Sequence, residues 1–384
     1  MRFFKLNILL FLLFYSSLAY CQLDNNGLLQ RVPVKPENAK EIRAEVYALG
    51  YFRNNEYFNK IADGYTLFGY QLNPSLIYYP ASFVRLEAGV FLRKDFGSSG
   101  YQNILPTFRA KVQKENWALV FGTLEGSLSH GYIEPLYDFE RVITDRVENG
   151  VQFLLNTDRV KLDAWIDWRN MIYEGDSTQE DIAGGGSAAL ALLNKEGRLG
   201  PGHNLELRLP VQFTMQHKGG QIDASDLPLL TVVNAAAGLE LAQHYPSYLA
   251  VERLYTKNYL VGFKTVSGVE RMPYENGHGL YFNAGVDTKY ADAMLSYWKG
   301  NGYVAELGGK LYQSASTTYK YPDYLEENRE LLVLRLMKDF EILDNLTLTV
   351  RLEPLYDFNS SEIEFSHSFF VNLNTGFFVA KSKN

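Results

Sequence analysis

Cysteine is almost absent from this sequence. Among its 384 residues there is one cysteine, Cys21, close to the N-terminus. If Cys21 leaves with a leader segment, the mature chain contains no thiol. A disulfide scaffold, a thiolate zinc site and a cysteine nucleophile are then all excluded.

The N-terminal residues predict secretion. Arg2 and Lys5 form a small basic region, Leu6–Tyr15 is an apolar run, and small residues follow up to Cys21. The run is too short to cross a membrane as a helix, so residues 1–21 are interpreted as a signal peptide. Cys21 could instead be a lipidated cysteine, because the sequence LAYC resembles a lipobox.

The sequence also lacks an excess of positive charge and any second long hydrophobic run. It contains 37 Lys and Arg residues against 44 Asp and Glu residues, for a net charge of −7. An acidic chain is a poor binder of the phosphate backbone, so we expect no nucleic acid as a partner. A secreted β-rich protein, either soluble or in an outer membrane, remains.

Strict alternation of apolar and polar residues is abundant. In Leu205–Met215 the odd positions are apolar, and the even positions include Glu206, Arg208 and Gln212. The same pattern occurs in Phe83–Arg93, Lys161–Arg169 and Leu346–Leu352. A period of two residues is typical of β-strands, and here each strand has one apolar face and one charged face.

Strand length separates a membrane barrel from a soluble sandwich. The alternating segments run for about ten to thirteen residues, as a tilted bilayer span requires, whereas sandwich strands are commonly about five or six. Short turns also alternate with long polar loops. The sequence therefore predicts an all-β fold: a transmembrane antiparallel up-and-down β-barrel of about 16 strands, with fourteen or eighteen also possible. Residues 22–40 are interpreted as a periplasmic N-terminal segment and residues 41–384 as the barrel.

The last strand and the aromatic residues near strand ends carry a family resemblance. The C-terminal FFVNLNTGFFVAKSKN resembles the β-signal of outer-membrane proteins, and Tyr51, Trp117 and Trp298 suit an interfacial aromatic girdle. The chain resembles Gram-negative bacterial outer-membrane β-barrel proteins of the porin-like kind. This resemblance implies residence in the outer membrane and contact with its lipid. It also implies a passive channel for small solutes and possible contacts with other outer-membrane or periplasmic proteins.

Charged residues on the polar faces are the candidates for lining a pore. They are Arg85, Glu87, Arg109, Lys111, Glu125, Lys161, Asp163, Asp167, Arg169, Glu206, Arg208, Arg335, Arg351 and Glu353. The mixture of signs predicts at most a weak ion preference. It also permits cross-strand salt bridges that fill the interior and leave no conduit.

The hexapeptide EPLYDF occurs at Glu134–Phe139 and again at Glu353–Phe358. Since proline cannot donate to a ladder, both copies are interpreted as strand exits at the outer rim. The first copy lies in Ser129–Glu148, which lacks a convincing strand pattern. By resemblance to porins this segment is a candidate constriction loop, although it could equally stand in solvent. Its candidate residues are Glu134, Asp138, Glu140, Arg141, Asp145 and Arg146.

Motifs for catalysis or cofactor binding are missing. The six histidines are His130, His203, His217, His244, His278 and His367, and they lack metal-ligand spacing. No serine lies in a nucleophile elbow and no glycine-rich segment has the form of a phosphate loop. We therefore expect no cofactor and no enzyme. The alternatives are a non-conducting scaffold or adhesion barrel and, remotely, a rim hydrolase whose activity would be lost on His278→Ala.

Overall fold

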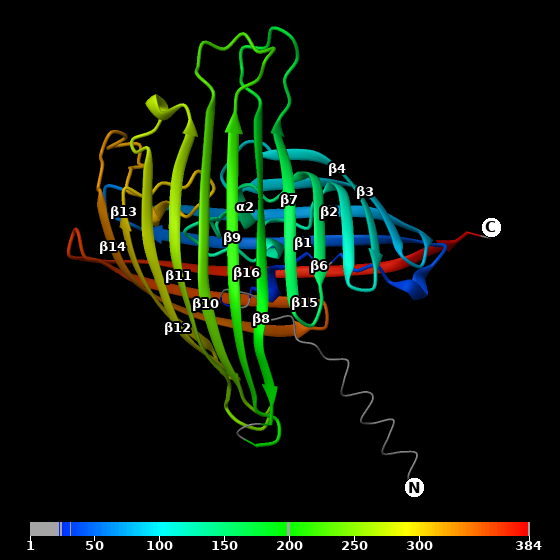
Figure 1. The fold of residues 1–384 in the computed structure, drawn as a ribbon. Coiled ribbons are helices and arrows are strands. Elements are labelled where there is room, and N and C mark those ends of the chain that lie inside the picture. The colour runs from blue at the N-terminus through cyan, green and yellow to red at the C-terminus, as the bar shows by residue number, and fades with distance from the viewer. Residues whose placement is uncertain (1–22, 24, 31, 198–199, 383–384) are drawn as a thin grey trace.

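The computed structural model describes residues 23, 25–30, 32–197 and 200–382. The predicted signal peptide, with Cys21, lies outside these residues. The described residues form sixteen antiparallel strands closed into one barrel, in which every strand pairs with its sequence neighbours and β1 pairs with β16 (Figure 1). The predicted fold class and strand number are confirmed.

The strands differ widely in length. They are β1 (Glu41–Glu56), β2 (Tyr65–Ala81), β3 (Val84–Asp95), β4 (Asn103–Lys114), β5 (Trp117–Thr123), β6 (Asn149–Asn156), β7 (Val160–Asn170), β8 (Asp181–Glu196), β9 (Asn204–Lys218), β10 (Leu230–His244), β11 (Val251–Ser267), β12 (Asn276–Thr288), β13 (Asp292–Asn301), β14 (Asn328–Leu343), β15 (Leu346–Asp357) and β16 (Glu362–Lys381). The one α-helix among the described residues, α2 (Arg141–Thr144), is a single turn. No helix in the described ranges is long and apolar enough to cross a membrane.

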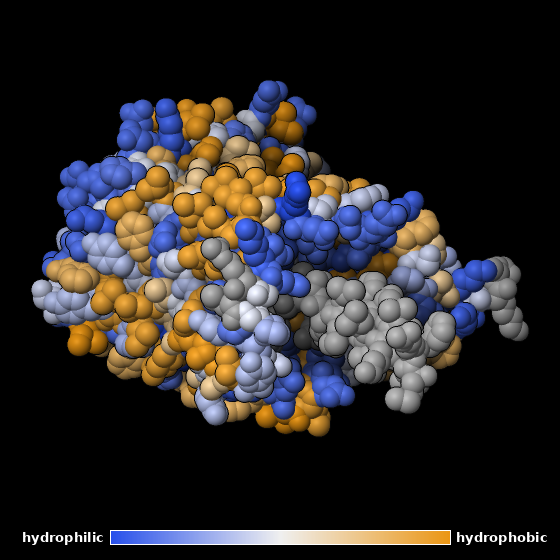
Figure 2. All heavy atoms as spheres, turned by 60° about the horizontal axis from the view of Figure 1, so that its bottom comes forward, coloured by the Kyte–Doolittle hydropathy of each residue, from blue (hydrophilic) through white to orange (hydrophobic). Residues whose placement is uncertain are grey.

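The two faces of each strand meet different surroundings. In β9, Val211 is 48% exposed and Phe213 is 49% exposed, whereas Gln212 between them is 2% exposed. Figure 2 shows hydrophobic residues spread over the barrel wall and hydrophilic residues gathered toward its ends. Hydrocarbon solvates apolar side chains, and the outer wall presents them. A closed barrel also pairs its backbone polar groups within the sheet, so both requirements for crossing a membrane are met.

The strands of the barrel wall are shortest at the hairpin of β5 and β6. In the described structure, β5 pairs with β4 only over Arg109–Lys114, so the outer half of β4 extends past it. The intervening residues 124–148 turn into the barrel, where Ile133 and Leu136 are almost completely buried. The structure therefore places the candidate constriction loop in the lumen and not in solvent. We call residues 124–148 the lumen loop.

Two further segments occupy the interior. Residues 302–327, between β13 and β14, bury Tyr303, whose hydroxyl donates to the carbonyl of Pro135 at 2.9 Å. From the periplasmic end, the described part of the N-terminal segment buries Leu28 and Val32. Segments from both ends of the barrel therefore fill its lumen.

Candidate functional site

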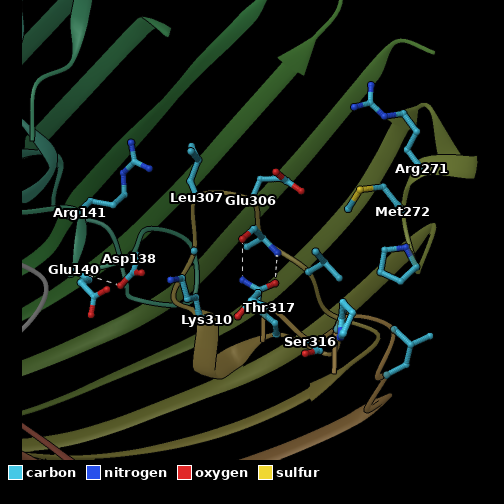
Figure 3. A pocket seen from close by; sticks show the side chains of 18 of the residues that line it. Asp138, Glu140, Arg141, Arg271, Met272, Glu306, Leu307, Lys310, Ser316 and Thr317 are labelled. Atoms are coloured by element: carbon cyan, nitrogen blue, oxygen red, sulfur yellow. Dashed lines mark hydrogen bonds between the residues drawn. The ribbon is translucent and has the colours of Figure 1, made fainter. Parts of the chain in front are cut away.

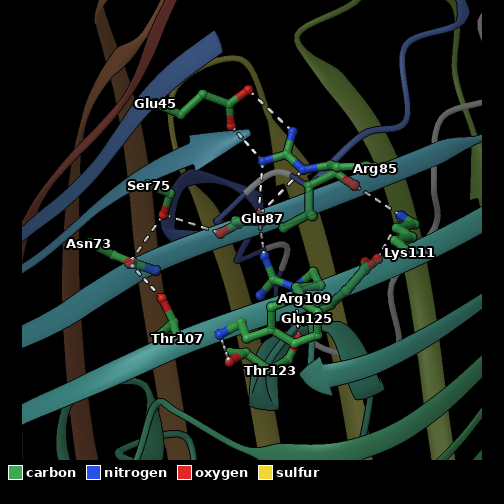
Figure 4. A network of polar contacts seen from close by, with 12 residues as sticks. Glu45, Asn73, Ser75, Arg85, Glu87, Thr107, Arg109, Lys111, Thr123 and Glu125 are labelled. Atoms are coloured by element: carbon green, nitrogen blue, oxygen red, sulfur yellow. Dashed lines mark hydrogen bonds and ion pairs between the residues drawn. The ribbon is translucent and has the colours of Figure 1, made fainter. Parts of the chain in front are cut away.

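The predicted pore-lining charges of β3 and β4 form an interior ion-pair network. Arg85 lies 2.7 Å from Glu45 and 3.0 Å from Glu87, and Arg109 lies 2.9 Å from Glu87 (Figure 4). Lys111 lies 2.6 Å from Glu125. Glu125 was expected on the polar face of a strand, but it follows the end of β5. Arg85, Glu87 and Arg109 are each at most 3% exposed. Such pairing holds the strands and the lumen loop together and leaves little charge for a passing solute.

The two EPLYDF copies meet in the lumen. Arg335 pairs with Glu134 of the first copy and lies 3.1 Å from Glu353 of the second. Arg351 lies 2.8 Å from Glu353 and 3.7 Å from Glu134. Arg53 of β1 adds a third guanidinium, 2.8 Å from Glu353. Two identical glutamates therefore share the same arginines, which ties the lumen loop to β14 and β15.

The interpretation of EPLYDF as a strand exit is wrong for the first copy, and for the second copy only the expected end of pairing at Pro354 is wrong. The first copy lies in the lumen loop, outside any strand. The second spans the outer end of β15, with Phe358 just beyond the strand, but pairing with β16 continues past Pro354 to Asp357. The described ladder between β14 and β15 is interrupted at Glu353 and Pro354, which suits a proline because it has no N–H to donate.

The other constriction-loop candidates pin the loop at its base. Glu140 accepts hydrogen bonds from Asn55 at 2.9 Å and from Tyr65, and it also pairs with Arg53. Arg141 and Asp145 form an ion pair within the loop, at 2.6 Å. The guanidinium of Arg146 stacks over the ring of Tyr47 at 4.2 Å.

His130 is an anchor of the lumen loop that sequence reasoning passed over. Its Nδ1 lies 3.0 Å from Asp163, its Nε2 lies 2.9 Å from Glu148, and its ring stacks on Trp165 at 4.6 Å. Burial lowers the pKa of His130, but Asp163 and Glu148 outweigh this effect and raise the pKa to about 10. The two carboxylates therefore favour the cationic form of His130 within a buried triad. The residues next to His130 in the sequence form no pattern that would predict contact with Asp163 and Glu148.

The remaining pore-lining candidates are spread along the barrel height. Asp167 accepts a hydrogen bond from the backbone of Asn149 at 2.7 Å. At the outer end of β7, Arg169 lies 3.4 Å from Asp145. Near the periplasmic end of β9, Glu206 lies 2.5 Å from Arg208. Lys161 is half-buried at the periplasmic end of β7. These side chains form local contacts and do not form one ring.

A polar cluster interrupts the apolar outer face at the outer ends of β9, β10 and β11. His217 lies across from Thr231, and Thr231 lies across from Ser267. The Nδ1 atom of His217 is 2.9 Å from Oγ1 of Thr231, and the hydroxyl of Ser267 donates to the same oxygen at 2.8 Å. We call these three residues the rim cluster.

A bulge brings the third member into the rim cluster. The register of β10 and β11 shifts between Thr231 and Val232, so that Ser267 pairs with Thr231 while Thr265 pairs with Val232. A bulge commonly redirects a side chain at a sheet edge. It puts Ser267 on the face of Thr231, although the odd positions of β11 before it face the lumen.

The rim cluster has the elements of a hydroxyl nucleophile and its base. A threonine hydroxyl in contact with an imidazole is the pairing by which proteins activate a weak nucleophile. Among the described residues, His217 has no carboxylate partner. No described group of three or more His, Cys, Asp or Glu residues could hold a metal ion.

The apolar wall and the charged interior define an integral outer-membrane β-barrel protein. A family model described as Lipid A 3'-O-deacylase-type matches residues 34–382. The chain belongs to this family.

Several solved outer-membrane proteins are similar to this chain. OprD from Pseudomonas aeruginosa has a TM-score of 0.47 and 9% identity, covering 88% of this chain and 95% of its own. A loop L8 deletion mutant of OmpT from Vibrio cholerae has a TM-score of 0.47 and 10% identity, covering 88% and 100%. OccK3 (OpdO) from Pseudomonas aeruginosa has a TM-score of 0.46 and 11% identity, covering 88% and 97%. No curated protein matches the chain.

The prediction that the chain is not an enzyme is wrong, because the family it belongs to is an enzyme family. The error has a physical cause. A site on a barrel rim draws each residue from a different strand, so its members are separated in sequence by a hairpin and leave no contiguous motif. In the rim cluster, His217, Thr231 and Ser267 come from three strands.

Proposed function

We propose that this protein hydrolyses an acyl ester of an outer-leaflet lipid, the lipid A type of substrate that its family description names, and that the rim cluster carries the reaction. The supporting observation is the hydrogen-bonded chain of His217, Thr231 and Ser267 on the outward face of the barrel. It lies at the outer ends of the strands, where ester groups of outer-leaflet lipids meet water. The lipid of the outer membrane is thus the principal partner.

The geometry suits a two-step acyl transfer. Thr231 Oγ1 attacks the ester carbonyl and gives its proton to Nδ1 of His217, which passes it to the departing alcohol. Water then attacks the threonyl ester and loses a proton to His217. His217 passes this proton to the departing Oγ1 of Thr231, which releases the fatty acid and restores the threonine hydroxyl. Ser267 donates to Thr231 Oγ1, and this hydrogen bond orients the threonine hydroxyl toward His217.

The filled lumen supports a surface reaction over the passive channel proposed from sequence. A channel for small solutes needs an aqueous path past the lumen loop, whose anchors Glu140, Glu148 and His130 are each at most 5% exposed. The third hypothesis, a non-conducting scaffold, shares the filled lumen but needs no chemistry at the rim. Hydrolysis therefore separates the scaffold from the enzyme, and conductance separates both from the channel.

The test is release of fatty acid from lipid A in mixed micelles with the purified protein, followed by mass spectrometry of lipid and product. We expect Thr231→Val and His217→Ala to lower the rate at least about 100-fold, the usual share of a nucleophile or a general base. Thr231→Val preserves the shape of the side chain and removes only its hydroxyl.

His278→Ala is the matched control. His278 also lies on the outward face at an outer strand end, on β12, and is exposed. Its replacement should leave hydrolysis unchanged. If Thr231→Val retains the full rate, the rim cluster is not the site. If the wild-type protein releases no fatty acid, the enzymatic proposal itself is wrong.

A further inference from the structure

A cavity opens between the lumen loop and the residues 302–327 on the outer side of the barrel. Its volume is about 760 Å³, within the usual range for small-molecule sites. Figure 3 shows Asp138, Glu140 and Lys310 on one side and Arg271 and Met272 on the opposite side. Arg271 and Met272 belong to a third segment, between β11 and β12. All three segments connect the outer ends of strands, so the cavity lies at the extracellular end.

The cavity is held open by hydrogen bonds that do not involve a ligand. The backbone N–H of Asp138 donates to the carbonyl of Leu307 at 2.8 Å, which joins its two main walls. Thr317 donates from both its backbone and its hydroxyl to the carbonyl of Ile61. A preformed cavity of this kind loses little conformational entropy when it binds a ligand.

The charges around the cavity are unequal. Its lining includes five carboxylates against three basic side chains, namely Asp138, Glu140, Asp145, Glu306 and Asp323 against Arg141, Arg271 and Lys310. Several are already engaged: Glu306 pairs with Lys218 at 3.1 Å, and Arg271 donates to Gln179 and to the carbonyl of Pro228. In the described structure Asp323 has no hydrogen-bond or ion-pair partner. The surplus of acid disfavours a polyanionic ligand.

Arg141 supplies an independent sign of a missing partner. It is 8% exposed and lines the cavity, and its Nη2 contacts Asp145. Its Nε has no hydrogen-bond partner within the described ranges. A buried N–H without an acceptor is costly, although the guanidinium also lies 4.9 Å over the ring of Tyr137. A ligand that accepts hydrogen bonds as well as donating them to carboxylates fits a lining with both kinds of group.

We propose that this cavity binds a short saccharide, uncharged or amine-bearing, of about two or three sugar units. Sugar hydroxyls both donate and accept, which satisfies Asp323 and Arg141 together. The C–H faces of sugar rings can pack on Met272 and Pro273. Its source is either a free oligosaccharide or an uncharged part of the glycan of an outer-leaflet lipid, because both present the same hydroxyl groups. The site is separate from the rim cluster and does not depend on its activity.

The experiment is isothermal titration calorimetry on the purified full chain, in a detergent without a sugar headgroup. The probes are chitotriose, which is neutral, a glucosamine trimer, which carries amines, and trigalacturonic acid, which is anionic. We expect one of the first two to bind and the anionic trimer to bind at least tenfold more weakly. Asp323→Asn and Asp138→Asn should weaken the binding at least tenfold.

Asp344→Asn is the control, because Asp344 lies in the periplasmic turn between β14 and β15. Asp323 is exposed, so its amide variant should fold normally, and heat-modifiable gel migration verifies this for every variant. Absence of binding by all three trimers overturns the proposal. Equal binding by wild type and Asp323→Asn, or tightest binding of the anionic trimer, also overturns it.

Two further experiments identify the source of the sugar and test whether the saccharide site is independent of the proposed hydrolase site. Glycan cleaved from outer-leaflet lipid and freed of its phosphates should compete with the bound trimer, whereas competition by intact glycolipid alone would contradict a sugar site. Thr231→Val should bind the trimer as wild type does. Loss of hydrolysis with retained binding would then separate the two sites, and loss of both in this variant would contradict their independence.

Discussion

At the scale of single residues, the interior of this barrel is governed by the cost of burying charge. His130, Asp163 and Glu148 are each at most 5% exposed, and they are stable there because each has an opposite charge within about 3 Å. Removing one member leaves the others buried without compensation. Buried charges therefore specify where the lumen loop docks more than they add to stability.

Replacing His130 should destabilise the protein strongly. In His130→Ala, Asp163 and Glu148 lose their shared cation, which costs about 3–5 kcal/mol. Urea unfolding in detergent, followed by tryptophan fluorescence, measures the loss, and Trp165 on the histidine ring is a local reporter. His244→Ala is the control, since its half-buried contact with Glu206 is 3.7 Å long and should contribute under about 1 kcal/mol. A similar loss in both variants would contradict the role of the triad.

The docking of the lumen loop should depend on pH through Asp138. Burial and the nearby Glu140 raise the pKa of Asp138 from its ordinary value of 3.8 to about 7. Between these two values the docked loop binds a proton that the undocked loop does not, so docking is favoured at low pH and weakens as the pH rises through 7. We expect a loss of about 1–2 kcal/mol between pH 5.5 and pH 8.

Hydrogen exchange of residues 133–145, corrected for the intrinsic rate at each pH, measures this change. Asp138→Asn should remove the pH dependence, because an amide does not titrate. Protection that increases with pH in the wild type would contradict the assignment.

At the scale of elements, the short hairpin of β5 and β6 decides what fills the barrel. Because β5 ends at Thr123, the chain leaves the wall below the rim and enters the lumen. Residues 302–327 then pack on it from above, through contacts such as Tyr303 with Pro135. Long inward segments of this kind are usually functional.

Removing the lumen loop should convert a barrel that does not conduct ions into one that does. We expect planar bilayers with the wild-type protein to show no stable open steps, and replacement of residues 126–146 by a short Gly-Ser linker to produce them. Shortening residues 221–226, between β9 and β10, is the control and should stay silent. Stable steps from the wild type would instead support the passive channel.

At the scale of the whole molecule, the distribution of apolar side chains sets the orientation in the membrane. Trp117 and Trp168 face outward and are 38% and 44% exposed, whereas Trp165 and Trp298 are 3% and 1% exposed in the interior. The predicted girdle position is wrong for Trp298 and for Tyr51, which is 2% exposed, because both side chains face the interior. The four tryptophans thus report on both sides of the wall. Adjacent residues of β7 face opposite ways, as the alternating sheet requires.

Brominated acyl chains should distinguish these two groups of tryptophans. In single-tryptophan variants reconstituted into brominated lipid, Trp117 and Trp168 should lose most of their fluorescence. Trp165 and Trp298 should lose little, because bromine quenches only at short range. Strong quenching of Trp165 would mean that the wall is inverted or open to lipid.

The sequence allowed much of the architecture to be predicted. Leu209, Val211 and Phe213 alternate with Gln212 and Thr214, and this local pattern assigned the faces of β9 correctly. The contacts of the rim cluster, which we propose as the enzyme site, were not predictable in the same way. His217 and Ser267 are separated by a hairpin and a further strand, and a bulge in β11 brings them to one oxygen of Thr231.

The amino-acid sequence by itself determined a membrane barrel, its outward apolar face and a strand number near sixteen. Period-two alternation and strand length are local properties, and hydrocarbon selects between the two faces of every strand independently. Only the tertiary structure decided that Glu134 and Glu353 share the same arginines, that the lumen is filled, and which hydroxyl meets an imidazole at the rim. These contacts depend on register and loop docking, which bring together residues that no local pattern relates.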